Sequence, residues 1–188
     1  MGRKPGALSD VVDMLEHQHE QIRRGFDLVA RGGPDRARNW RKLRRLLAVH
    51  ETAEEAHVHP VARKKVPGGK HVIESRLLEE KAAKKMLKAL DKMGPGHPRF
   101  DPLLATFRRA VLSHAKREER EEFRPLRQTV SLPRRRSLTL EAKATQALAP
   151  TRPHPRVNSQ LANKMAAPVA GPVDRLRDGF AALLGRRH

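Results

Sequence analysis

Four segments of the chain carry apolar side chains three or four residues apart, and this periodicity restricts the fold more than any other feature. Such spacing places side chains on one face of an α-helix, whereas a half-buried strand alternates every second residue. The segments begin near Ser9, Pro34, Gly69 and Asp101, with short Gly- or Pro-containing connections between them. The pattern predicts an all-α fold, an antiparallel up-down four-helix bundle, with Ser9 as the first N-cap.

Histidine and glutamate interrupt all four apolar stripes. The interrupting residues are His19 in the first segment, His50 and Glu54 in the second, Glu80 in the third, and His114 and Glu118 in the fourth. A buried imidazole or carboxylate without a partner costs several kcal/mol, so four such interruptions would burden a small core. We therefore expect these side chains to converge on a polar centre that holds a cation.

Two of the segments share a longer pattern. His50-x-x-x-Glu54 and His114-x-x-x-Glu118 each place both side chains on one helix face, within reach of one ion or of adjacent ions. The stretches HETAEEAHVHP and HAKREEREEFRP both read H-x-x-x-E-E and then reach a proline. This similarity predicts an internal repeat of two helical hairpins.

Imidazole and carboxylate donors without sulfur suit iron, manganese or zinc. Six donors exceed what a tetrahedral zinc ion requires, and glutamates can bridge two ions, so a non-haem di-iron centre fits better than manganese or zinc. A ferritin-like site requires Glu-x-x-His on two helices. Glu16 and His19 have this spacing, as do Glu54 and His57, but the fourth segment has no histidine three residues after its glutamate.

The arrangement resembles the hemerythrin-like HHE cation-binding family over residues 10–126. That family carries a lone His on helix one, H-x-x-x-E on helix two, a His on helix three and H-x-x-x-E on helix four. The stretches DMLEHQHEQI, HETAEEAHVHP, EEKAAKKML and HAKREEREEF lie where those motifs belong. The resemblance implies a metal-binding bundle whose small ligands are dioxygen, nitric oxide or peroxide. His19 takes the helix-one role, because it lies on the apolar stripe and His17 does not.

The third helix departs from the family pattern. Where the family has Glu-His, this chain has Glu79-Glu80, and Glu80 falls at the histidine position. Additional anionic oxygen donors favour ferric iron, which argues against a reversible oxygen carrier. In the alternative reading, Lys84 neutralises Glu80 four residues away and the site is defective.

Two further alternatives stay open. Glu51 is a ligand or an exposed residue of the helix surface, and we favour the exposed residue. His57 and His59 contact ligand carboxylates or end a solvated helix.

Amino-acid composition excludes several kinds of site and of catalysis. The 188 residues include 40 Lys and Arg against 21 Asp and Glu, for a net charge of +19, and no cysteine. Iron–sulfur clusters, disulfides and thiol catalysis are excluded, while nonspecific contact with nucleic acid is expected. Charge and proline content divide the chain into a bundle, residues 1–126, and a basic extension, residues 127–188, with short helices at 137–148 and 172–184. Without a signal segment or a membrane span we expect a cytoplasmic protein.

These features favour a metal- or gas-binding protein over a dedicated enzyme. The first hypothesis is a di-iron protein that binds or senses dioxygen, nitric oxide or peroxide, or that handles iron. The alternative is an enzyme that disproportionates peroxide or oxidises ferrous iron at the same centre. The second alternative is a basic, nucleic-acid-associated bundle.

Overall fold

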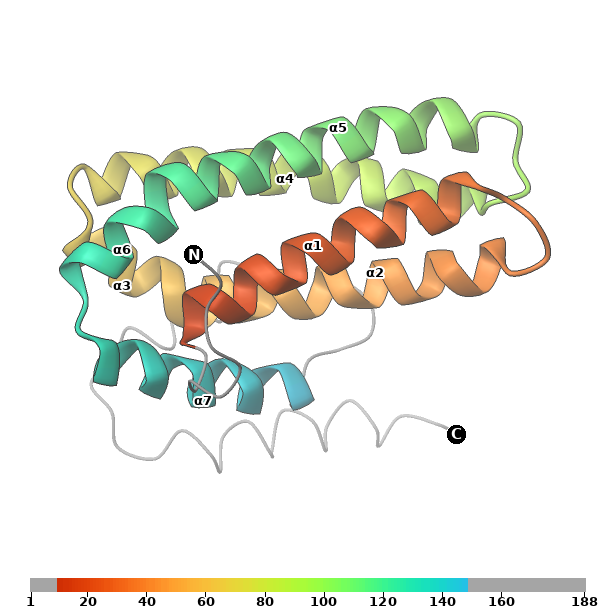
Figure 1. The fold of residues 1–188 in the computed structure, drawn as a ribbon. Coiled ribbons are helices and arrows are strands. Elements are labelled where there is room, and N and C mark those ends of the chain that lie inside the picture. Colours follow the sequence, from red (N-terminus) through yellow and green to blue (C-terminus); the bar gives the residue numbers. More distant parts are fainter. Residues whose placement is uncertain (1–9, 149–188) are drawn as a thin grey trace, which may run out of the picture. The chain divides into compact units, whose positions relative to one another are not determined.

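The computed structural model describes residues 10–148, and this part of the chain contains helices and no strand. Four long helices account for most of it: α1 (Val11–Ala30), α2 (Arg36–Ala53), α4 (Gly69–Met93) and α5 (Phe100–Glu118). The chain passes back and forth along them, so that α1 lies beside α2 and α4 beside α5 (Figure 1). The predicted all-α class is confirmed.

Helix α1 begins with a capping box. The Asp10 carboxylate accepts hydrogen bonds from the amides of Val12 and Asp13, and the Asp13 side chain accepts one from the Asp10 amide. Three amides that have no partner within the helix are thereby satisfied. The N-cap is therefore Asp10 rather than the predicted Ser9.

Each helix that carries H-x-x-x-E continues directly into a wider π-helical turn. The turn η1 (Glu54–Val58) joins α2 to α3 (His59–Lys65), and η2 (Glu119–Phe123) joins α5 to α6 (Arg124–Thr129). In η1 the His59 amide bonds to the Glu54 carbonyl, five residues back, and Pro60 follows. A proline has no amide hydrogen, and its ring clashes with the carbonyl four residues earlier in a regular α-helix, so the wide turn accommodates it.

The apolar core has two clusters that lie on either side of the polar centre along α1. The first takes Val12 and Leu15 from the start of this helix, and the second takes Ile22 and Phe26 from further along. His19 lies between the two clusters and is 3% exposed. Apolar packing at both ends therefore encloses the polar side chains and limits their contact with water.

Helix α7 (Leu132–Leu148) belongs to the basic extension and packs on the long helices. It begins at Leu132 rather than at the predicted residue 137, and it contacts α1, α2 and η1. Leu138 and Ala142 are fully buried and belong to the first apolar cluster. The predicted helix at 172–184 lies outside the described residues.

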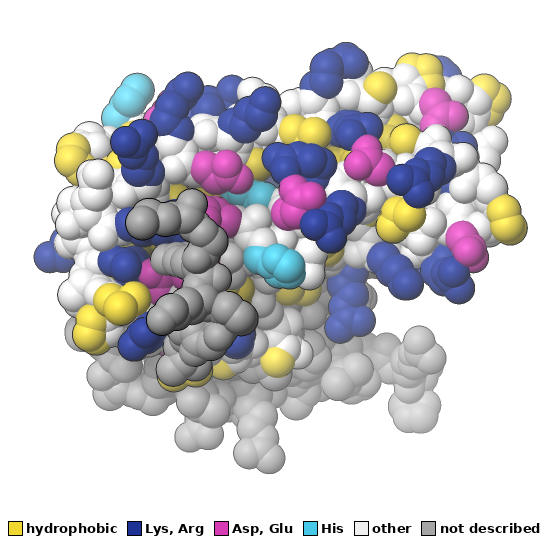
Figure 2. Space-filling view, in the orientation of Figure 1, with side chains coloured by type: hydrophobic (Ala, Val, Ile, Leu, Met, Phe, Trp, Pro, Cys, Tyr) yellow, Lys and Arg dark blue, Asp and Glu magenta, His cyan; other side chains and the backbone are white. Residues whose placement is uncertain are grey.

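Basic side chains are distributed widely over the surface. Figure 2 shows Lys and Arg spread across one face of the molecule with Asp and Glu between them, and not gathered into a single patch. Within residues 10–148, no helix is long and apolar enough to cross a membrane.

Candidate metal centre

The six predicted site residues lie together in the middle of the long helices. His19, His50, Glu54 and Glu118 form one group whose potential ligand atoms lie within 4.8 Å of one another. Glu80, His114 and Glu118 form a second group under the same limit. Glu118 belongs to both groups, so its carboxylate lies between two candidate cation positions.

Three histidines face this centre in the same way. For each ring, Nδ1 has an acceptor outside the centre: Glu119 Oε1 at 2.8 Å from His19, Gln18 Oε1 at 3.0 Å from His50, and Glu79 Oε2 at 2.8 Å from His114. A carboxylate or an amide oxygen can only accept, so each Nδ1 carries the proton and donates it. Metal-binding histidines are oriented in this manner, with one nitrogen hydrogen-bonded outward and the other left for the ion.

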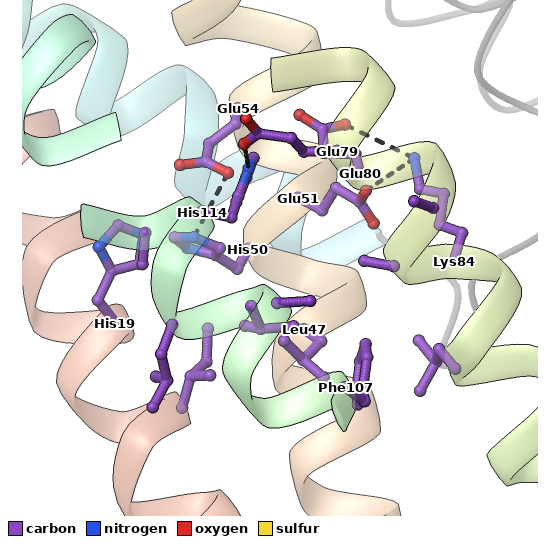
Figure 3. Close-up of a pocket in the computed structure, with 18 of the residues that line it drawn as sticks. His19, Leu47, His50, Glu51, Glu54, Glu79, Glu80, Lys84, Phe107 and His114 are labelled. Atoms are coloured by element: carbon purple, nitrogen blue, oxygen red, sulfur yellow. Dashed lines mark hydrogen bonds and ion pairs between the residues drawn. The ribbon is translucent and has the colours of Figure 1, made fainter. Parts of the chain in front are cut away.

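The Nε2 atoms of these rings face carboxylate oxygens. His19 Nε2 lies 3.3 Å from Glu118 Oε2, and His114 Nε2 lies 3.0 Å from Glu118 Oε1. His50 Nε2 lies 3.4 Å from Glu54 Oε2 (Figure 3). The two oxygens of Glu118 therefore face histidines from different groups, which is the position that a bridging carboxylate requires.

Several buried atoms of the centre have no hydrogen-bond partner in the described part of the chain. They are His19 Nε2, Glu54 Oε1, Glu80 Oε2, both carboxylate oxygens of Glu118, and Glu122 Oε2. Buried polar atoms are rarely left unpaired, because each costs about 1–3 kcal/mol in desolvation. Their concentration at one place, with nitrogen and oxygen lone pairs directed inward, fits a cation held between the helices.

Two further buried residues, His59 and Glu122, belong to the centre and were not among the six predicted ligands. His59 donates from Nδ1 to Glu122 at 2.9 Å and lies with Nε2 3.0 Å from Glu80 Oε1. His59, Glu118 and Glu122 form another group of possible ligands.

Of the two readings left open for His57 and His59, contact with site carboxylates is observed for His59. The His57 ring contacts Thr145 and Glu141 on α7 instead.

The π-helical turn explains why periodicity missed His59. A regular helix through the second segment predicts His57 and Val61 on the buried face, but the buried residues are Val58, His59 and Ala62. One additional residue in the turn η1 shifts the buried face by one position. The proline that follows was the only sign of this shift in the sequence.

Glu80 is buried, at 4% exposure, and it contacts both His59 and Lys84. Lys84 Nζ lies 3.8 Å from Glu80 but only 2.8 Å from Glu51 (Figure 3), and it lies 2.6 Å from Glu55. Lys84 therefore pairs mainly with Glu51 of α2 and Glu55 of η1. Glu51 is half-buried, at 19% exposure, and is not the exposed surface residue that we favoured.

Comparison with known proteins agrees with this geometry. The model of the Hemerythrin HHE cation binding domain matches residues 10–126. The chain belongs to this family. A solved structure of a hemerythrin HHE cation binding domain-containing protein of Mycobacterium kansasii superposes with a TM-score of 0.65 at 14% identity, over 83% of this chain and 89% of that one. No curated protein sequence matches the chain.

The family match stops at residue 126, before α7 begins at Leu132. At 14% identity, the structural neighbour shows the helical fold alone and does not identify ligands in this chain. Within the HHE domain, the chain keeps the lone histidine and both H-x-x-x-E pairs. It differs at Glu80, where the resemblance led us to expect histidine.

Without a metal ion, protonated histidines partly balance the negative charges of the buried carboxylates. Burial lowers the pKa of His114, but the negative charge of Glu118 and the hydrogen bond to Glu79 raise it to about 10. Burial also lowers the pKa of His59, and hydrogen bonds to Glu122 and Glu80 raise it well above its usual value. Burial, together with the neighbouring His19, lowers the pKa of His50 to about 3, so this ring is neutral and its Nε2 lone pair is free.

An apolar cavity of about 200 Å³ adjoins the centre of the HHE domain. Its walls combine His50 and His114 with apolar side chains, among them Leu47 and Phe107 (Figure 3). A cavity of this size and polarity has room for a small uncharged molecule next to the Nε2 atoms.

Proposed function

We propose that the protein binds iron as a dinuclear non-haem centre between its four long helices, and that the bound iron takes up a small ligand such as dioxygen, nitric oxide or peroxide. The position of Glu118 carries this proposal, because its two oxygens face histidines from two ligand groups. The donor set of imidazoles and carboxylates without sulfur favours iron over softer ions.

The residues of each group have distinct parts in this proposal. His19, His50 and Glu54 would hold one ion, His114 and Glu80 the other, and Glu118 would link the two. When bound, iron would supply an open coordination position and redox chemistry. The chain itself supplies fixed ring orientations through Gln18, Glu79 and Glu119, and apolar walls that limit access of water.

The direct test is the metal content of the full chain purified after growth with iron. We expect about two iron atoms per chain, and the variant His50→Ala should lose metal because it removes a neutral, buried donor. His17→Ala is the matched control, since His17 is exposed on α1 and faces Gln21 instead of the centre. A metal-free protein, or equal iron in wild type and His50→Ala, would overturn the proposal.

Peroxide chemistry is the second candidate, and the position of His59 favours it. This buried imidazolium contacts the possible ligand Glu80 and can hold a proton beside the centre. Steady oxygen evolution from peroxide that is lost in Glu118→Ala would support an enzyme. A stable nitric oxide or dioxygen adduct without turnover would support a binding or sensing protein.

A further inference from the structure

We infer that α7, which lies beyond the family match, sets the orientation and the tautomer of the site histidine His50 through an amide pair formed by Gln18 and Gln146. This inference rests on the proposed function of the centre. It gives the start of the C-terminal extension a part in metal binding. Gln18 and Gln146 are positioning residues, because neither is placed to touch the metal.

The contacts form a chain from α7 to His50. Gln146 on α7 and Gln18 on α1 exchange two hydrogen bonds: each Nε2 donates to the other Oε1 at 3.3 Å. Gln146 Nε2 also lies 3.4 Å from the Val49 carbonyl, next to His50 in the sequence. Gln18 Oε1 in turn accepts the proton of His50 Nδ1 at 3.0 Å.

The amide pair determines which end of Gln18 faces His50. A free glutamine amide could present either its oxygen or its NH₂ group to an imidazole, and the two choices select opposite tautomers. The Val49 carbonyl can only accept, so Gln146 directs its Nε2 towards that carbonyl and its Oε1 towards Gln18 Nε2. This orientation leaves Gln18 Oε1 for His50. His50 is then protonated at Nδ1 and bare at Nε2, the atom that faces Glu54.

The other two site histidines do not depend on α7. His19 and His114 donate from Nδ1 to the carboxylates of Glu119 and Glu79, which lie on η2 and α4 within the family match. A carboxylate accepts at either oxygen and needs no further orientation. His50 alone among these three has a neutral amide as its partner, so it alone requires a second group to orient that partner.

The test uses the variants Gln146→Met and Gln18→Met in the full chain, with Gln128→Met and Gln21→Met as controls. Both controls remove exposed glutamines, one that follows the second π-turn and one on α1. Nitrogen-15 NMR of histidine-labelled, metal-free protein reports the tautomer of His50 directly. Competition with a metal-binding dye reports the affinity for ferrous iron.

In the wild type and both controls we expect His50 with a protonated Nδ1. Gln18→Met should lose this tautomer and lower the metal affinity by about ten- to a hundred-fold. Gln146→Met should give a mixture of tautomers and a smaller loss, up to about ten-fold, because Gln18 remains but is no longer oriented. Circular dichroism should show all four variants folded, since none of the four glutamines belongs to an apolar cluster.

Two results would overturn the inference: a wild-type His50 protonated at Nε2, or a Gln146→Met variant that matches the Gln128→Met control in both tautomer and affinity. A wild type that binds no metal would overturn the proposed function. The tautomer measurement is made on metal-free protein, so it would still decide the inference about α7 in that case.

Discussion

At the scale of single residues, Glu80 is the position where this chain departs from its family. Its side chain is buried and one of its oxygens has no hydrogen-bond partner, while its other oxygen contacts His59. Lys84 neutralises Glu51 and Glu55 at shorter distances than Glu80. The geometry therefore leaves Glu80 available as an anionic donor.

We expect Glu80→Ala to lower iron affinity by at least about ten-fold, because it removes a donor that faces the centre. Glu80→His should keep the metal and change its absorption spectrum towards that of a histidine-rich site. Glu74→Ala on the same helix is the control, since Glu74 is 49% exposed and its ion-pair partner among residues 10–148 is Arg63. If Glu80 serves only Lys84, titration with iron will show no difference among the three variants.

The sequence pattern singled out six side chains that the structure brings together. His19, His50, Glu54, Glu80, His114 and Glu118 occupy helical faces, and a helical face is a local property that periodicity reports. The partners of the imidazoles were not predicted. Gln18, Glu79 and Glu119 come from neighbouring helices or turns, so their contacts depend on how the helices pack, which no local pattern contains.

At the scale of elements, the π-turns decide which side chains enter the centre. Deleting Ala56 removes the additional residue of η1 and should restore a regular helix, in which the Pro60 ring clashes with the carbonyl four residues earlier. We expect a loss of about 3 kcal/mol in the free energy of unfolding, measured with urea. Adding Pro60→Ala to the deletion should recover most of this loss.

The two variants together make the test specific. If the Ala56 deletion and the deletion combined with Pro60→Ala have the same free energy of unfolding, the proline is not the reason for the wide turn. The sequence could have indicated both turns, because each H-x-x-x-E helix runs into a proline that a regular helix excludes. Periodicity alone treats such a helix as continuous and assigns the wrong face beyond the turn.

Helix α7 gives a second prediction at this scale. Leu138 is fully buried in the first apolar cluster, whereas Leu140 is 71% exposed on the same helix. Leu138→Ala should therefore cost about 2–5 kcal/mol in the free energy of unfolding, and Leu140→Ala less than about 0.5 kcal/mol. Equal effects of the two substitutions in urea unfolding would show that α7 does not pack as described.

At the scale of the whole molecule, the buried titratable groups make the metal-free protein sensitive to pH. Burial raises the pKa of Glu51 to about 8 and that of Glu55 to about 7, and contacts with carboxylates raise that of His114 to about 10. In the unfolded chain these groups lose their protons near 4.5 for glutamate and 6.5 for histidine. The folded state thus holds more protons between pH 6.5 and 10.

Stability must fall with rising pH wherever the folded state binds more protons than the unfolded state. We expect the melting temperature of the metal-free protein, measured in the presence of a chelator, to decrease by roughly 5 °C or more from pH 6.5 to pH 10. A metal ion bound to His114 would displace the proton of this ring, so the loaded protein should show a flatter profile. A melting temperature that rises over this range would contradict the pKa directions given above.

The position of α7 also determines which fragment of this chain can stand for the whole in an experiment. A fragment cut at residue 126 would contain every residue that sequence similarity identifies, and it would look complete in any comparison of domains. It would nevertheless expose the buried surface under Leu138 and leave Gln18 without its partner. A negative result obtained with such a fragment would reflect the truncation and not the full chain. Both the apolar core and the hydrogen bonds of Gln18 include residues of α7, which lies beyond the family match.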